Sequence, residues 1–196
     1  MNKNLIRHMA AERTLERLKP YIEGKLFLKL NEQKTKICRV TDPDLKFLGF
    51  GFWRSRNGAE VRACLHQKSK AKCRQRLRAI TSRSRGQSLE EFRRELRAFV
   101  RGWGNYFKTS SMSQFLRETD EWLHRRIRQI YWKQWKKVRT KYAALRKLGV
   151  KEGKAWEWAN AYKSYWHVAN SWILSTMLNN GTLRKLGWTC LGDVYY

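Results

Sequence analysis

Residues 88–107 read SLEEFRRELRAFVRGWGNYF and form the clearest helical pattern in the chain. Ser88 and Glu91 have the spacing of a capping box, in which each side chain satisfies a free backbone amide at the start of a helix. Apolar residues then recur every three or four positions, which gives the helix one apolar stripe. The stripe predicts a helix that packs against other helices, and its members are Phe92, Leu96, Phe99, Trp103 and Phe107.

Helical patterns also surround this segment. Residues 68–80 carry a thin apolar stripe under many cations, and residues 81–86 form a polar, basic connector. A second long helix is expected from about 114 to 139, and a third from about 154 that spans Trp156 and Trp166. Asn179-Asn-Gly181 is expected to end the third helix, and 183–196 to form a short helix plus loop. The residues expected to face inward are Cys73, Leu77, Ile80, Leu116, Leu123, Ile127 and Ile130.

The N-terminal third has a different pattern. A helix is predicted over 10–23, with Pro20 near its end, and a short strand over 26–30. Asp42-Pro43-Asp44 predicts a turn. Strands are expected over 47–53 and 60–65, joined by a hairpin at Asn57-Gly58. The sequence therefore predicts a mainly α fold with a small β element, divided into residues 1–66 and an all-helical 67–196.

The composition favours a polyanionic partner. The 196 residues include 43 Lys and Arg against 16 Asp and Glu, a formal net charge of +27. Nucleic acid is the best match, because neutralising phosphates releases counterions. No stretch approaches the roughly 18 apolar residues of a membrane span. A signal-peptide pattern is absent from the first residues. We therefore expect no membrane partner and a location in the cytoplasm, in the bacterial cytosol or nucleoid.

Residues that carry chemistry are sparse. The four aspartates lie at 42, 44, 120 and 193, and the four histidines stand apart from any suitable nucleophile. Two-metal catalysis needs converging carboxylates, which this spacing does not suggest. Cys64, His66 and Cys73 lack a fourth ligand at the usual zinc spacing. The sequence predicts no catalytic residue, no metal site and no cofactor in this chain.

Cations and tryptophans point to nucleic acid. Residues 68–101 hold twelve Lys and Arg against three Glu, and residues 117–151 hold twelve against three acidic residues. A surface that only confers solubility usually mixes both signs. Trp103, Trp122 and Trp166 fit the inward stripes. Four others lie among cations, where they stack on bases or wedge helix against helix, and these are Trp132, Trp135, Trp156 and Trp158.

Two segments resemble one protein family. The order of LFLKLN (26–31), EQKTK (32–36) and FLGF (47–50) resembles the last two palm blocks of a group II intron reverse transcriptase. RGWGNYF (101–107), LHRRI (123–127) and LGWTCL (186–191) resemble the maturase-specific domain, the polymerase thumb, of the same proteins. The resemblance implies a helix–strand–hairpin palm remnant followed by a helical bundle. The Tyr-x-Asp-Asp metal-binding motif does not occur in the sequence, so no polymerase activity is expected from this chain alone.

The resemblance also assigns roles to residues. Lys34 corresponds to a lysine that assists the leaving pyrophosphate, which requires a partner chain that supplies the aspartates, and the complete family enzyme uses Mg²⁺. Phe47, Leu48 and Gly49 correspond to the hairpin that grips the primer end. The glycines of the 101–107 signature are expected to allow close approach, and its aromatic residues to pack the bundle. Together with the cationic runs, the predicted RNA or primer contacts are Lys29, Asn31, Lys34, Lys36, Phe47, Leu48, Gly49, Lys68, Lys70, Lys72, Arg74, Arg76, Arg101, Arg125, Arg126, Arg128, Lys133, Lys136 and Lys137.

Three hypotheses follow. The first is a maturase module that binds structured group II intron RNA and assists its splicing. The alternative is the C-terminal subunit of a split reverse transcriptase, with an N-terminal reverse transcriptase fragment as partner and DNA or an RNA–DNA duplex as a further ligand. The third is an RNA-associated assembly protein that has kept the fold without intron specificity.

Overall fold

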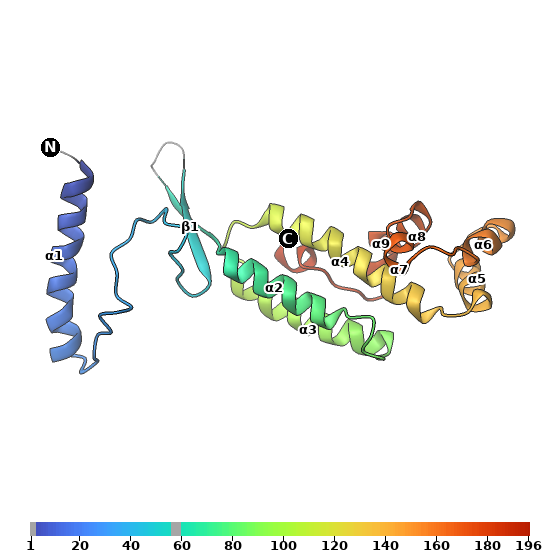
Figure 1. Ribbon diagram of the computed structural model, residues 1–196, viewed down its shortest axis with the longest axis horizontal. Coiled ribbons are helices and arrows are strands. Elements are labelled where there is room, and N and C mark those ends of the chain that lie inside the picture. Colours follow the sequence, from blue (N-terminus) through green and yellow to red (C-terminus); the bar gives the residue numbers. More distant parts are fainter. Residues whose placement is uncertain (1–2, 56–59) are drawn as a thin grey trace.

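The computed structural model describes residues 3–55 and 60–196 and is mainly helical with one two-stranded hairpin (Figure 1). This confirms the predicted fold class. The elements, in chain order, are α1 (Lys3–Gly24), β1 (Phe50–Arg54), β2 (Val61–Leu65), α2 (Gln67–Ile80), α3 (Leu89–Phe107), α4 (Ser113–Gln134), α5 (Val138–Lys147), α6 (Glu152–Ala159), α7 (Tyr165–Ala169), α8 (Trp172–Met177), α9 (Asn180–Lys185) and α10 (Gly192–Tyr195).

The core lies between α2, α3 and α4, which run side by side in Figure 1. The predicted capping box starts α3: the Ser88 hydroxyl accepts from the Glu91 amide at 3.2 Å, and the Ser88 amide donates to the Glu91 carboxylate at 2.8 Å. Most of the expected apolar residues are buried, although Phe99 and Trp103 are only half-buried and the sequence pattern missed Val100 and Gly104. The fully enclosed members of this core include Cys73, Leu77, Ile80, Leu96, Val100, Leu116, Leu123, Ile127 and Ile130.

The C-terminal segment completes this core. Trp188 is 3% exposed, and its indole N–H donates to the Tyr131 hydroxyl of α4 at 3.0 Å. Arg93 and Arg97 of α3 donate to the Leu186 and Gly187 carbonyls at 2.6 and 3.0 Å. The α10 helix then packs across α3 and α4. The tail is therefore part of the domain's interior.

Gly104 shows why the 101–107 signature needs a glycine. A β-carbon there would lie 2.9 Å from Val194 Cγ1 of α10, closer than carbon atoms can approach. Gly102 has no neighbour within 4 Å of that position. The prediction of close approach is therefore confirmed for Gly104 and wrong for Gly102. Trp103 and Phe107 pack as predicted, with ring centroids 4.8 Å apart.

The β element is an antiparallel pair in which Phe50 faces Leu65 and Arg54 faces Val61. The strand expected over 47–53 therefore begins later, at Phe50. The predicted Asn57-Gly58 turn lies outside the described residues. Asp42-Pro43-Asp44 forms the expected turn, because the Asp44 amide donates to the Asp42 carboxylate at 2.9 Å and the Leu45 amide to the Asp42 carbonyl at 3.0 Å.

The N-terminal prediction was wrong in one element. Residues 26–30 form no strand, and Phe27 has a positive φ of 54°. A strand needs a neighbouring strand to satisfy its amides, and no described strand lies beside this segment. The preceding helix is longer than predicted, because it begins at Lys3, and Pro20 lies four positions before its last residue, Gly24.

Two predicted helices are also shorter. The helix expected to reach residue 139 ends at Gln134, because Trp135 turns the chain and stacks on Tyr131 and Trp132. The helix expected from 154 through Trp166 is divided into α6 and α7. Asn179 does lie at a helix boundary, but it caps the start of α9 by accepting from the Thr182 amide at 2.9 Å.

Helices α5 and α6 form a second, smaller apolar cluster beyond the end of α4 (Figure 1). Leu145, Ala155 and Ala159 are fully enclosed there. No helix in residues 3–55 and 60–196 has the length and apolarity needed to cross a membrane.

Candidate nucleic-acid interface

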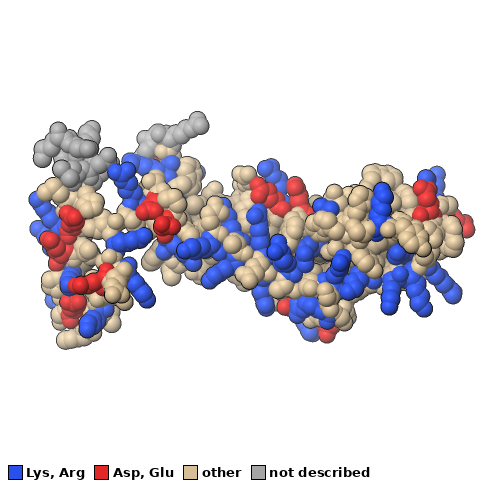
Figure 2. Space-filling view, viewed as in Figure 1, with Lys and Arg blue, Asp and Glu red and all other residues tan. Residues whose placement is uncertain are grey.

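The exposed side of α2 carries the densest group of cations. Figure 2 shows Lys and Arg side chains along the middle of the visible face, over α2 and on toward α5, with acidic side chains at its rims. Ser69, Cys73, Leu77 and Ile80 turn inward, so the charged residues between them face solvent. The α2 cations whose side chains form no hydrogen bond or ion pair with any described residue are Lys68, Lys70, Lys72 and Arg78.

Two other predicted cations of α2 have acidic partners. Arg74 lies 3.3 Å from Glu118, and Arg76 lies 3.6 Å from Glu95. The side chains of Arg74 and Arg76 are 49% and 59% exposed. Exposed ion pairs of this kind add little to stability. Both side chains can therefore exchange a carboxylate for a phosphate at small cost.

The three predicted arginines of α4 bond within the protein. Arg126 donates to the Thr81 hydroxyl at 2.6 Å and to the Arg78 and Thr81 carbonyls at 3.0 Å. Arg125 donates to the Trp166 carbonyl at 3.1 Å, and Arg128 to the Leu178 carbonyl at 2.9 Å.

These bonds tie α4 to the end of α2, to α7 and to the end of α8. Sequence reasoning treated the three arginines as solvated or phosphate-bound, and that reading missed their acceptors. Their contact with RNA stays a prediction. The carbonyl acceptors lie 41 to 50 positions away in the chain, so no local pattern could identify them.

The other predicted cations of the helical body are exposed or half-exposed. Lys133 donates to the Arg83 carbonyl at 2.9 Å. Lys136 and Lys137 lie where α4 gives way to α5, and Arg101 lies on the outer side of α3. The side chains of Lys136, Lys137 and Arg101 form no hydrogen bond or ion pair within the described part of the chain.

The predicted primer contacts divide into two groups. Lys29, Asn31, Lys34 and Lys36 lie in the extended segment between α1 and β1, away from the helical body (Figure 1). Asn31 uses its side chain locally, accepting from the Lys34 amide at 3.1 Å. The structure therefore does not bring these four residues to the cationic face of α2.

Phe47, Leu48 and Gly49 form a tight turn that docks on the helical body. The Leu48 carbonyl accepts from the Tyr106 hydroxyl at 3.0 Å, and the Gly49 carbonyl accepts from the Ser69 hydroxyl at 2.7 Å. Gly49 has a φ of 87°, and a β-carbon there would lie 3.1 Å from the Phe107 ring, so glycine is needed at this position. The turn thus connects the hairpin to α2 and α3.

His66 caps helix α2 and holds the turn at Pro43. Its Nδ1 accepts from the Lys68 amide at 3.1 Å, which caps α2, and its Nε2 lies 3.0 Å from the Pro43 carbonyl, to which it donates. Across the described residues, no three His, Cys, Asp or Glu side chains group as a metal site would require.

The tryptophans divide differently from the prediction. Trp132 is 2% exposed and Trp158 is 9% exposed, so these two are core residues. Trp156 is 58% exposed and packs only its edge against Tyr142, with ring centroids 5.7 Å apart. Trp122 and Trp166, expected in the core, are only half-buried.

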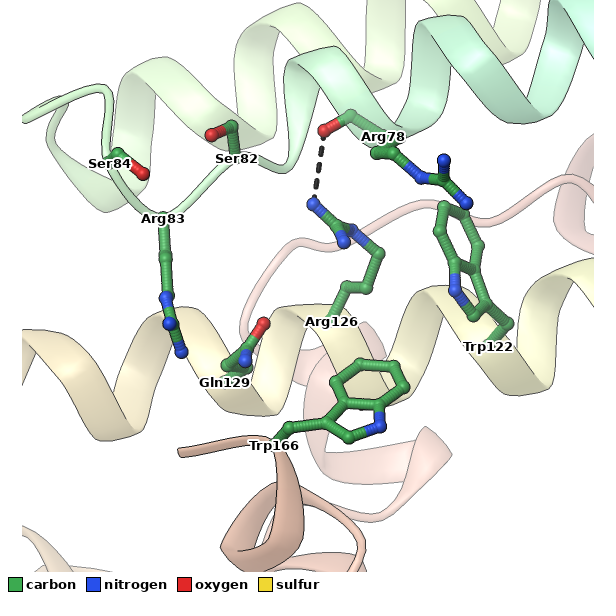
Figure 3. A pocket seen from close by; sticks show the side chains of 8 residues that line it. All are labelled: Arg78, Ser82, Arg83, Ser84, Trp122, Arg126, Gln129 and Trp166. Atoms are coloured by element: carbon green, nitrogen blue, oxygen red, sulfur yellow. Dashed lines mark hydrogen bonds between the residues drawn. The ribbon is translucent and has the colours of Figure 1, made fainter. Parts of the chain in front are cut away.

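A hollow of about 430 Å³ lies between the end of α2, the 81–86 connector, α4 and α7 (Figure 3). No acidic residue lines it. Three guanidinium groups, two hydroxyls, one amide and two indoles do, and these belong to Arg78, Arg83, Arg126, Ser82, Ser84, Gln129, Trp122 and Trp166. In Figure 3 the Arg78 guanidinium lies beside the Trp122 indole, and Trp166 faces the hollow from the opposite end.

Arg83 and Ser84 also line a second hollow of about 220 Å³, next to the first. The side-chain oxygen of Gln87 at its border is buried without a hydrogen-bond partner. The connector therefore borders two small recesses, and Phe92 and Ile130 make the wall of the second one partly apolar.

One buried cluster places a thiol beside an imidazole, a pair of groups that can act in catalysis. Cys190 Sγ lies 3.2 Å from His124 Nε2, so His124 does not stand apart from a thiol as the sequence suggested. Burial raises the pKa of Cys190, and burial also lowers the pKa of His124 to about 4. A protonated thiol beside a weakly basic imidazole is a poor nucleophile.

Asp120, next to this cluster, holds the C-terminal tail. Its two oxygens accept from the Leu191 and Gly192 amides at 2.9 and 2.7 Å, which holds the start of α10. Burial raises the pKa of Asp120 to about 6 despite these bonds. The cluster therefore fixes the C-terminal tail.

The fold and surface together define a helical domain with one strongly cationic face, the kind of surface that binds polyanions. Residues 59–149 match the family model described as the group II intron, maturase-specific domain. This match confirms the resemblance to a maturase-specific domain for residues 59–149. No curated protein matches the chain.

The matched segment includes β2, α2, α3, α4 and α5, and thus the α2 cations and most of the hollow. Trp166 lies outside it, as does the tail that closes the core. The division of the chain at residue 66 stays a prediction.

Proposed function

We propose that this chain binds structured group II intron RNA through the α2 face and assists the splicing of that RNA, while the RNA itself carries out the chemistry. The observation that supports this most is the position of the unpaired cations. Lys68, Lys70, Lys72 and Arg78 have no acidic partner among the described residues, and all four lie within the maturase-specific segment.

The physical basis is electrostatic. Cations without acidic partners repel one another, and a phosphate backbone relieves that repulsion while it releases counterions. An interface of this kind positions RNA by phosphate and shape, because the grooves of A-form RNA give side chains little access to base edges. The chain would therefore stabilise a folded RNA.

The first test measures binding to a structured intron RNA as a function of salt. If about five phosphates are neutralised, log affinity should fall with log salt at a slope of roughly −4 to −5. The double variant K68A/K72A removes two cations that share one side of α2. Its slope should be less steep by about 2, because each phosphate contact contributes about 0.9.

The matched control is R13A/R17A, which removes the same charge from exposed positions of α1, outside the matched segment. This variant should keep the wild-type slope within about 0.5 of its value. Equal slopes for K68A/K72A and wild type would exclude the α2 face. A splicing assay with the same variants then links binding to function.

The alternative hypothesis, a subunit of a split reverse transcriptase, is favoured by one observation. Phe27, Leu28, Phe47 and Leu48 are 60% to 86% exposed, and they belong to the segments that resemble the palm. Exposed apolar side chains in such number mark a contact surface. Co-expression with an N-terminal fragment that carries the Tyr-x-Asp-Asp motif should then give a stable complex and primer extension. Absence of both would exclude this alternative.

A further inference from the structure

The hollow between α2 and α4 has a glutamine in its wall. Gln129 is 8% exposed, lines the hollow, and its side chain makes no hydrogen bond with any described residue. Its amide atoms are not enclosed, so they reach solvent at the hollow. A polar side chain that is otherwise buried usually has a partner, and the polar edge of a ligand in the hollow could supply one.

The aromatic wall suggests what kind of ligand this is. Arg125 stacks on Trp166 with its guanidinium carbon 3.7 Å from the ring centroid. Arg125 does not line the hollow, whereas Trp166 does. One face of the indole is therefore covered by Arg125, and Trp166 also lines the hollow, where Figure 3 shows it near Gln129 and Arg126. Indole surface of this kind is what a nucleobase stacks on.

The cationic wall supplies the complementary charge. Arg78, Arg83 and Arg126 border the hollow, and no carboxylate does. Burial, and then the charges of Arg78 and Arg83, lower the pKa of Arg126. Arg126 is held by the Thr81 hydroxyl and carbonyl. The Arg83 guanidinium lies over the Tyr165 ring, 5.0 Å from its centroid, and its N–H groups are left open to an anion, as are those of Arg78.

We propose that this hollow receives one unpaired nucleotide of the bound RNA. Its base stacks on Trp166 and its polar edge bonds the Gln129 amide, while the adjoining phosphate lies against Arg78 and Arg83. The volume of about 430 Å³ lies within the usual range of small-ligand sites, roughly 300–1,000 Å³. This inference rests on the proposed function and adds a preference for RNA with an extruded nucleotide.

The test compares two labelled RNA hairpins that differ only by a single-nucleotide bulge, with binding measured by fluorescence anisotropy. Wild-type protein should bind the bulged hairpin roughly tenfold more tightly, which is the range of one base stacked on an aromatic side chain. The variants W166L and Q129M should bind both hairpins equally, within about twofold.

Two matched controls change the same side chains elsewhere. Trp172 is 68% exposed on α8, and Gln114 is exposed on α4, and neither lines the hollow. The variants W172L and Q114M should keep the tenfold preference. Circular dichroism shows whether W166L is folded, and Q129M carries the test if W166L is not.

The double variant R78A/R83A addresses the phosphate. Its salt slope on the bulged hairpin should be less steep than that of wild type by about 1 to 2. A bulge preference that survives in Q129M, or no preference in wild type, would overturn the proposed nucleotide site. Failure of wild type to bind either hairpin in a salt-dependent way would instead overturn the proposed function itself.

Discussion

Replacing Arg126 by Met should destabilise the domain, although the residue looks like one more surface cation in the sequence. The side chain makes three bonds, to the Thr81 hydroxyl at 2.6 Å and to the Arg78 and Thr81 carbonyls at 3.0 Å. These bonds connect α4 to the last turn of α2 and the connector that follows. Met fills similar volume but leaves two carbonyls and a buried hydroxyl without this donor.

The expected loss in unfolding free energy is about 3 kcal/mol. A hydrogen bond to a charged group contributes about 1.5–3 kcal/mol, and bonds that share one partly exposed guanidinium do not add fully. With a urea dependence of about 2 kcal/mol per molar, the midpoint of urea unfolding should fall by roughly 1–2 M. Circular dichroism at 222 nm, which reports helix content, measures this midpoint.

Arg94 provides the matched control, because it lies exposed on α3 and its side chain forms no hydrogen bond or ion pair within the described residues; its charge acts only on the exposed Glu91. The variant R94M should stay within about 0.5 kcal/mol of wild type. The variant R126K keeps the charge but loses the forked geometry, so it should lie between wild type and R126M. An R126M midpoint equal to that of R94M would refute the structural role of Arg126.

Two further predictions concern the tail. The variant G104A should lower the unfolding free energy by about 1–2 kcal/mol, because the added carbon would lie 2.9 Å from Val194; G102A, with no neighbour within 4 Å, should gain up to about 1 kcal/mol. Thermal unfolding of the two variants checks this, and an equal effect would refute the close-approach argument. The stability contributed by Asp120, whose pKa is raised to about 6, is present at low pH and is lost as pH rises through 6. The pKa of His124 is lowered to about 4, so the stability contributed by neutral His124 is present above pH 6.5 and is lost as pH falls toward 4. The two contributions oppose each other, so D120N should lose about 2 kcal/mol more than wild type between pH 7 and pH 4.5, measured by urea unfolding at both values; equal losses would contradict the assignment.

The features that sequence reasoning predicted are local ones. The Ser88 capping box depends on residues three positions apart, and the inward stripe of α2 on residues three and four apart, so a short pattern contains both. The turn at Asp42 likewise depends on its immediate neighbours. The maturase-specific segment was predicted from the 101–107 and 123–127 motifs, and the family match confirms it.

The features that sequence reasoning missed depend on distant partners. Residues 26–30 have a strand pattern but no strand beside them, and α4 ends where Trp135 packs back on Tyr131. The role of Arg126 depends on carbonyls 45 to 48 positions away. The hollow was also missed, because it forms only where α7 packs against α4, and these segments are about 40 positions apart in the chain. Its one local signal was the basic connector at 81–86, whose serines and arginine form one wall.

Because the C-terminal tail closes the core, the domain cannot finish folding until its translation is complete. A ribosome releases a chain from its N-terminal end, so α2, α3 and α4 emerge while residues 183–195 are still being made. Until then Tyr131 lacks its Trp188 partner, Asp120 has no amides to hold, and the groove beside Gly104 is bare. The cationic face of α2 is thus exposed before the tail can close the core.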